Sequence, residues 1–543
     1  MKKGIFIAMM AVCSIQIQAQ FSGKGSGTEK DPYQVTNADE LFEVRNDLSA
    51  YYKQMNDIDL TEWIEEESPQ QGWKPISSFL GIFDGGNHVI SGLTINRPNE
   101  SGIGLFGSVE GGEIKNCIIK SPVLVGNTNV GSIAGYSKIP ITNCTIIHPN
   151  LHGISCVGGV AGRILTNLDT SFINCSVFGG NISSESYAGG IIGRTEYSDI
   201  FETSSTSYII SCNYSSTSVN SKSNAGGIIG YAESYLRRYT NYANRTTIME
   251  NNISEANIVS DLECGGIVQL ADMKLTKMNN NIFYGTIKGG GDVHGIGRFY
   301  ELSTDNRSNF CNSDSLVSTG NIYRIGNRSS EENYAYNGMV LLQNGKQVVI
   351  EDGVNQGIGY GLRTLRKEST YVGAGFDFSN TWTIKEGETF PYLKAQVAPV
   401  TVTSFASGSK ATIKGTATEG TTVYVMIGDN MYESYILDGQ WEVSLGSINA
   451  GTVAKVYAMT RGRMPSISTK AIAESGSEPI LVDKVGDANS DGVIDTADVT
   501  AIINYILGKP SASFNKTNAD VTGDGEILID DAVQTVQLIM NAQ

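Results

Sequence analysis

Several residue types and patterns are scarce in this 543-residue chain, and each scarcity excludes a class of structure. Only 12 prolines stand against 62 glycines, which favours many tight turns over flexible low complexity. Charged residues make up 17% of the chain and hydrophobic residues 40%, which argues against a largely disordered chain. No segment approaches the roughly eighteen continuous apolar residues that a membrane helix needs, so we expect no transmembrane segment.

Positive charge and histidine are also scarce. The net charge of −17 disfavours binding to nucleic acid or to an anionic membrane surface. No nucleophile recurs beside the four histidines, and no pair of carboxylates stands out at a regular spacing. The sequence therefore assigns no catalytic residue, and we favour a protein that is not an enzyme.

The N-terminus has the pattern of a cleaved export signal. Lys2 and Lys3 precede a short apolar stretch, and a small-residue end follows at Ala19. This pattern predicts a signal peptide over residues 1–19 that is cleaved after Ala19. We therefore expect a secreted protein, either extracellular or at the cell surface.

Glycine-rich units recur through the first half of the chain. The first runs from Gly104 to Gly107, and the later copies close at Gly135, Gly162, Gly193 and Gly230. A cysteine stands 18 residues before each of these later closing glycines, at Cys117, Cys144, Cys175 and Cys212, and another follows at Cys311. One arm of the repeat is thus constant in length, while the other accepts insertions.

This spacing predicts stacked coils of short β-strands. Single coils cannot bury an apolar face, so they stack, and equivalent side chains form columns. We expect the repeat glycines to supply left-handed turns and close approach between coils. The cysteines then form a column of buried thiols, which we favour over disulfides.

The repeat motifs resemble the bacterial GLUG repeat family, and the resemblance covers about residues 27–395. It implies a mainly β fold with a right-handed parallel β-helix, or β-solenoid, over residues 20–396. Alternating strands follow, with Thr422–Ile427 and Gln440–Leu445 as the clearest examples, and residues 397–473 resemble a bacterial Ig-like β-sandwich. A polar linker over residues 474–483 leads to a final segment, 484–543.

Two twelve-residue loops in that final segment carry acidic side chains at calcium-binding spacing. Calcium prefers six to eight oxygen ligands, and the glycine at the sixth position, Gly492 in the first loop, permits a sharp turn. In the first loop the predicted ligands are Asp487, Asn489, Asp491, the Val493 carbonyl, Asp495 and Asp498. In the second they are Asp520, Thr522, Asp524, the Glu526 carbonyl and Asp531. Thr522 and Leu528 donate less well than their counterparts, so we expect two Ca²⁺ sites, the second weaker.

Each loop leads into an amphipathic helical pattern, Val499 to Leu507 and Ala532 to Met540. Two such units in tandem resemble a small, α-helical type I dockerin with two EF-hand-like loops. The resemblance implies a cohesin-like partner that contacts residues at matched positions of the two halves. These are Thr496, Ala497, Ile503 and Asn504 in the first half, and Ile529, Asp530, Val536 and Gln537 in the second.

The residues after four closing glycines form a candidate ligand ladder for a glycan or a host surface. They are Tyr136, Arg163, Arg194 and Tyr231.

Three hypotheses for the whole chain follow. The leading one is a multimodular scaffold or adhesin that docks through calcium. The first alternative is a dockerin-borne polysaccharide-degrading enzyme, a glycoside hydrolase or lyase that uses the β-helix. The second alternative makes the C-terminal module an intramolecular calcium stabiliser that docks on the Ig-like domain.

Overall fold

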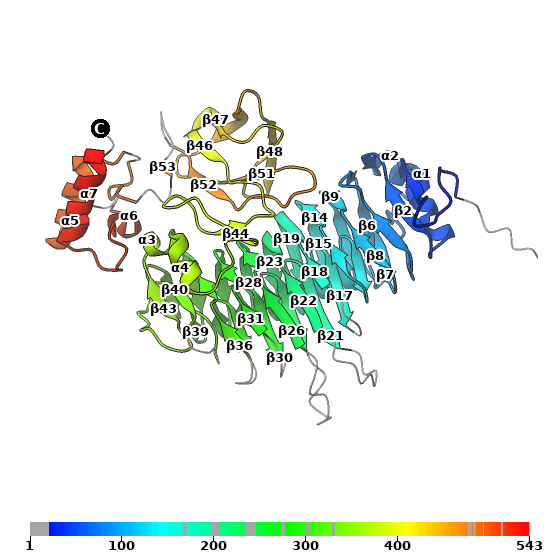
Figure 1. The fold of residues 1–543 in the computed structure, drawn as a ribbon, viewed down its shortest axis with the longest axis horizontal. Helices are drawn as coiled ribbons and strands as arrows, with labels where there is room; N and C mark the ends of the chain where they lie inside the picture. Colours follow the sequence, from blue (N-terminus) through cyan, green and yellow to red (C-terminus); the bar gives the residue numbers. More distant parts are fainter. Residues whose placement is uncertain are drawn as a thin grey trace, which may run out of the picture.

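The computed structural model is mainly β, with a small helical module at the C-terminus (Figure 1). It describes residues 21–166, 171–197, 207–233, 246–272, 277–299, 305–327, 332–474, 480–481, 485–491, 493–511 and 514–541. The predicted signal peptide and Gly492 lie outside these residues. In the described part of the chain, no helix is both long and apolar enough to cross a membrane.

Most of the chain folds into stacked coils of parallel strands, which we call the solenoid (residues 21–396). One coil contains β8 (Glu113–Lys115), β9 (Ile118–Lys120), β10 (Val123–Gly126), β11 (Thr128–Gly131) and β12 (Ala134–Ser137). Each strand pairs in parallel with its equivalent in the next coil; Ile141 pairs with Ile114, for example. Sheets of ten, nineteen, seven and seven strands result. The parallel, stacked architecture predicted from the repeats is confirmed, while its handedness stays a prediction.

The N-terminal end of the solenoid is covered by a short helix, α1 (Ala38–Glu43). Asn37 caps this helix, because its side chain accepts a hydrogen bond from the Glu40 N–H at 3.0 Å. Glu40 reaches back and accepts from the Thr36 N–H at 2.6 Å. A solenoid needs such covers, since its terminal coil would otherwise expose unpaired strand edges.

The column of cysteines is shorter than predicted. Ile173 pairs with Ser211, so Cys212 aligns with Asn174 and not with Cys175. Cys212 shares the positive φ of Asn174, +55° against +57°. The cause is a one-residue irregularity in the strand pairing at Gly179–Gly180, which makes the later coil one residue shorter. Cys212 therefore stands 18 residues before Gly230 only because this coil is one residue shorter, and Asn213 occupies the position that aligns with Cys175.

Cys311 is also outside the column, because it pairs with Phe283. Among the described cysteines, only Cys117, Cys144 and Cys175 occupy equivalent positions, and all three are fully buried. The seven described cysteines carry free thiols, and Cys212 alone among them is not buried.

A ladder of buried asparagines continues the column where the cysteines stop. In each step the side-chain amide N–H₂ donates to the next Oδ1 at 2.9–3.0 Å, and the backbone N–H donates to the same oxygen at 3.0–3.1 Å. The ladder residues are Asn213, Asn252, Asn281, Asn309 and Asn333, which are 0–1% exposed. Every buried amide in the column is thereby hydrogen-bonded.

The repeat glycines permit close packing and do not adopt left-handed turns. None of Gly135, Gly162, Gly193 and Gly230 has a positive φ. A Cβ at Gly193 would lie 2.6 Å from the carbonyl carbon of Cys156 and from the Gly162 oxygen. The expectation of left-handed conformations at these positions is wrong, while the expectation of close approach between coils is confirmed.

Two antiparallel sheets follow the solenoid, and we call them the antiparallel unit. One sheet contains β46 (Thr401–Ala406), β47 (Gly408–Thr416) and β50 (Gln440–Ile448). The other contains β48 (Thr422–Ile427), β49 (Asn430–Tyr435), β51 (Val453–Met459), β52 (Thr469–Ile472) and β53 (Ile480–Leu481). They enclose a core that includes Phe405, Val425 and Trp441. The assignment of this unit as Ig-like stays a prediction, as do the proposed domain boundaries.

The antiparallel unit lies along one flank of the solenoid, and the helical module lies at the solenoid's C-terminal end (Figure 1). Phe178 of the solenoid packs against Tyr424 and Tyr457, with ring centroids 5.4 and 5.5 Å apart. Lys120 forms an ion pair with Glu433 at 2.6 Å, and Arg461 forms one with Asp57 at 2.5 Å.

The C-terminal module contains three helices, α5 (Thr496–Ile506), α6 (Lys516–Ala519) and α7 (Ile529–Asn541). The two long helices begin three residues before the predicted patterns, because each starts inside its acidic loop. The core of the module is small and includes Ile502, Val521 and Ala532. So small a core leaves the module dependent on further stabilisation.

Candidate functional site: two acidic loops

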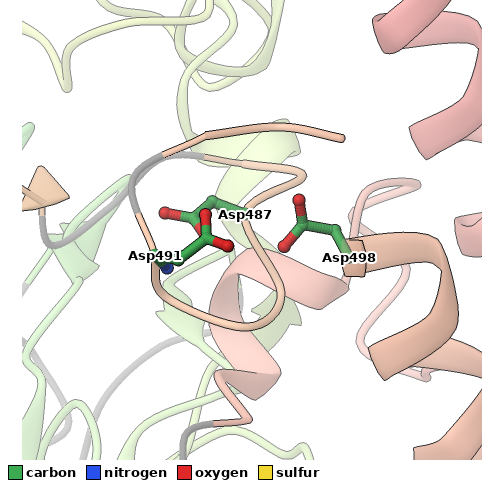
Figure 2. Close-up of side chains that lie close together, drawn as sticks. All are labelled: Asp487, Asp491 and Asp498. Atoms are coloured by element: carbon green, nitrogen blue, oxygen red, sulfur yellow. The ribbon is translucent and has the colours of Figure 1, made fainter. Parts of the chain in front are cut away.

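The first loop brings three carboxylates together. Single oxygens of Asp487, Asp491 and Asp498 all lie within 4.8 Å of one another. Figure 2 shows Asp487 and Asp491 on the turning loop and Asp498 reaching toward them from the start of α5. Asp487 and Asp498 are fully buried. Buried carboxylates so close together repel one another, and an oxygen-preferring cation offsets that repulsion.

Backbone donors fix the orientation of these carboxylates. The Asn489 N–H donates to one oxygen of Asp498 at 3.0 Å, and the Asp495 N–H donates to the other at 2.9 Å. The Asp491 N–H donates to Asp487 at 3.0 Å. Burial, the largest single effect, raises the pKa of the Asp498 carboxyl, while the two backbone donors lower it.

Asp495 has a different role from that of its neighbours. Its side chain accepts from the Ala497 N–H at 2.6 Å and caps α5, in a reciprocal capping box with Asp498. Asp495 is therefore not one of the three clustered carboxylates, although it lies beside them in the loop. Asn489 donates to Asp491 at 2.7 Å, so its amide contacts the cluster from the outside.

The second loop repeats the same internal hydrogen bonds. The Thr522 N–H donates to one oxygen of Asp531 at 2.8 Å, and the Leu528 N–H donates to the other at 2.8 Å. The Glu526 N–H donates to Asp524 at 2.9 Å, as the Val493 N–H does to Asp491 in the first loop. The two loops therefore share one backbone arrangement around their carboxylates.

A side-chain hydrogen bond further holds the carboxylate that ends the second loop. The Thr522 hydroxyl donates to Asp531 at 3.0 Å, a bond that a calcium ligand would have to give up. Asp520 accepts from the N–H groups of Gly523 and Gly525, and burial raises its pKa. Among the described residues, only the first loop gathers three acidic ligands within 4.8 Å. That the second site is the weaker of the two stays a prediction.

The donor set fits calcium. The sequences of both loops supply carboxylate and neutral oxygen ligands and contain no cysteine or histidine, and calcium takes such hard ligands. Calcium at each loop would neutralise the repulsion among the buried acids and so support a module with a small core.

The predicted partner-contact residues are all exposed. Ile503 and Val536 are 38% and 39% exposed, and Ile529 is 66% exposed. The remaining ones are Thr496, Ala497, Asn504, Asp530 and Gln537, and each is exposed as well. Exposed apolar side chains on both helices leave a surface that a partner protein can cover.

The candidate ligand ladder lies in one column, as its spacing predicts. Tyr136 pairs with Arg163, Arg163 with Arg194, and Arg194 with Tyr231. The cations already have partners, because Arg163 forms an ion pair with Glu196 and Arg194 lies 5.3 Å from the Tyr187 ring centroid. Binding of a ligand by this column stays a prediction.

Comparison with known proteins supports the assignment of the module. Residues 485–534 match the family described as the dockerin type I domain. Such a domain implies docking to a cohesin-type partner within a multimodular protein, and such proteins are generally extracellular or at the cell surface.

Two curated proteins share shorter segments with this chain. Halomucin of Haloquadratum walsbyi is 31% identical over 125 residues, 21% of this chain and 1% of that protein. A protein of Evansella cellulosilytica named "Putative Gly-rich membrane protein" is 38% identical over 103 residues, 18% of this chain and 12% of that protein. The chain thus spans only a small part of either relative.

One solved structure is also similar. It is a crystal structure titled as a "putative immunoglobulin A1 protease" from Bacteroides ovatus, 18% identical, with a TM-score of 0.41. The alignment covers 68% of this chain and 94% of that one.

Proposed function

We propose that this protein attaches to a cohesin-type partner outside the cell, in a calcium-dependent way, while its solenoid serves recognition, adhesion or display. The observation that carries this proposal is the separation of two sets of side chains. The carboxylates Asp487, Asp498 and Asp531 are fully buried in the loops, whereas the partner-contact residues of α5 and α7 are exposed. Calcium therefore orders the helices from within and leaves their outer face to a partner.

Binding to a panel of purified cohesin modules tests this proposal. The chain from residue 20 to 543 is immobilised, and binding is followed by biolayer interferometry in calcium and in chelator. We expect at least one cohesin to bind in calcium and none in chelator.

The variant Ile503→Asp, on the exposed face of α5, should weaken binding about tenfold or more, because a charge replaces an apolar contact. Leu437→Asp is the matched control, since Leu437 is 76% exposed on the antiparallel unit. The proposal fails if no cohesin binds a module that is folded in calcium, or if both variants weaken binding equally.

A second candidate function, the intramolecular stabiliser, is favoured by contacts between the module and the end of the solenoid. Arg363 in α3 (Leu362–Leu365) donates to the Val521 carbonyl at 3.0 Å and to Gln534 at 3.3 Å. The Thr364 hydroxyl donates to the Gly523 carbonyl at 3.3 Å. These hydrogen bonds join the second loop to the solenoid, whereas we expected docking on the antiparallel unit.

The two functions are compatible in geometry. The solenoid contacts Val521, Gly523 and Gln534, while Ile529 and Val536 of the same half stay exposed. One side of the module therefore rests on its own chain, and the other side is open to a partner.

A further inference from the structure

A cavity of about 850 Å³ lies where the solenoid, the antiparallel unit and the C-terminal module meet. Tyr284 and Asn312 line it from the solenoid, Lys455 lines it from β51, and Thr517 lines it from α6. Ligand pockets are typically about 300–1,000 Å³ and often lie between domains. Val340 and Val453, 42% and 49% exposed, also line this cavity, so it opens to solvent.

Direct contacts across the interface hold the walls of the cavity in place. The Ser468 N–H of the antiparallel unit donates to Glu255 of the solenoid at 3.0 Å. Glu255 also accepts from the Tyr214 hydroxyl at 2.7 Å, and Lys470 forms an ion pair with Asp314. Glu255 and Asp314, two of the four acidic residues that line the cavity, are therefore already engaged by groups of the protein.

Lys455 projects into this space without a partner of its own. Strand alternation places it on the same face of β51 as Tyr457, which packs on Phe178 of the solenoid. It is half-buried, and no described residue gives its ammonium a hydrogen bond or an ion pair. Burial lowers the pKa of Lys455, although Glu255 counters part of that effect.

An aromatic pair completes the lining. The Tyr284 and Phe390 rings stack with centroids 5.0 Å apart, and both residues line the cavity. A cation and an aromatic pair together suit a molecule with an acid group and an amphipathic ring.

We propose that this cavity binds a short carboxylated saccharide, whose carboxylate pairs with Lys455. The sugar ring packs against the aromatic pair. Binding here is independent of docking through α5 and α7, because none of the partner-contact residues lines the cavity.

Isothermal titration of the chain from residue 20 to 543 tests the proposal with two matched probes. One is the trisaccharide of β-1,4-linked glucuronic acid. The other is cellotriose, which has the same skeleton with hydroxymethyl groups in place of the carboxylates. We expect the acidic trisaccharide to bind at least tenfold more tightly than cellotriose at low salt.

Variants locate the binding site. Lys455→Met should remove the preference for the acidic probe. Lys414→Met, on β47 away from the cavity, is the matched control and should bind like wild type. Lys455→Gln replaces Lys455→Met if the latter lowers the melting temperature. The proposal is overturned if neither trisaccharide binds, or if the acidic probe binds equally well to wild type and to a folded Lys455 variant.

Discussion

His294 is a buried histidine without partners in the solenoid. It is fully buried, both ring nitrogens lack hydrogen bonds to described residues, and the ring stacks on Tyr323 at 5.0 Å. Burial, with a smaller effect from Arg298, lowers its pKa to about 3. The folded imidazole is therefore still neutral at about pH 6.5, the pH at which the same histidine in an unfolded chain binds a proton.

This pKa predicts a loss of stability in acid. The unfolded histidine titrates near pH 6.5, so its contribution is complete above that pH and is lost as the pH falls toward 3. Between pH 7 and pH 5 the loss attributable to His294 should be about 2 kcal/mol. His294→Phe should abolish this part of the pH dependence in urea unfolding, whereas His152→Phe, at an exposed position, should not. Equal slopes for wild type and His294→Phe would contradict the assignment.

Gly193 tests the close approach of coils at a single position. Gly193→Val should destabilise the solenoid by about 1–3 kcal/mol, because a side chain would overlap the backbone of the neighbouring coil. Gly353→Val is the control, since a Cβ there meets nothing within 4 Å. Thermal melts of the two variants compare them directly, and equal melting temperatures would count against the packing described at Gly193.

At the scale of elements, the two calcium loops are built alike but are unequal. Their shared backbone hydrogen bonds follow from the shared aspartates at loop positions 1, 5 and 12. The difference follows from Thr522 and Leu528, which stand where Asn489 and Asp495 stand in the first loop. Because calcium affinity depends on the number of charged ligands, the two sites should separate in a titration.

Metal removal and loop variants test this inequality. The module should lose helical circular dichroism in chelator and regain it with calcium. Asp487→Ala should weaken the tighter of two calcium-binding steps about tenfold or more, whereas Asp520→Ala should affect only the weaker step. A fully folded spectrum in chelator would contradict the dependence of the module on calcium.

The sequence predicted these elements unevenly. The acidic spacing located the loops and, through them, the clustered carboxylates. It did not reveal that Asp495 caps α5, because one aspartate can serve either as a ligand or as a cap. The cysteine spacing predicted the first coils correctly and then failed at Cys212. The coil that contains Cys212 is one residue shorter than the coil before it, because the strand pairing is irregular at Gly179–Gly180. The distance from cysteine to closing glycine therefore stays at 18 residues, although Cys212 lies one position before the column. The recurring asparagines after that point were a signal for the true column.

At the scale of the whole molecule, contacts between distant segments could not be read from the chain. Nothing local indicates that Arg363 reaches Val521 or that Phe178 packs on Tyr457. Such contacts depend on where each unit lies after folding, whereas repeat spacing and loop motifs are local.

The contact at Arg363 predicts coupling between calcium and the solenoid. If the second loop rests on α3, calcium should raise the melting temperature of the solenoid in the full chain. Arg363→Ala removes two hydrogen bonds and should reduce that stabilisation by about 1–2 kcal/mol. Arg461→Ala removes a contact between the solenoid and the antiparallel unit, and should leave the response to calcium unchanged. Calorimetry with and without calcium measures both, and an unchanged response in Arg363→Ala would argue against the stabiliser function.

The asparagine ladder makes the coils of the solenoid non-interchangeable. A coil that carries Cys144 presents a thiol at the column, whereas a coil that carries Asn252 presents an amide that is hydrogen-bonded to an amide on each side. At the start of the ladder, Asn213 instead accepts from the Cys175 N–H at 3.0 Å. Coils stacked out of order would therefore lose amide–amide hydrogen bonds. The column therefore fixes the order of the coils. A duplicated cysteine coil should be tolerated beside the other cysteine coils, and a duplicated asparagine coil within the asparagine ladder. A cysteine coil placed between two asparagine coils should destabilise the solenoid.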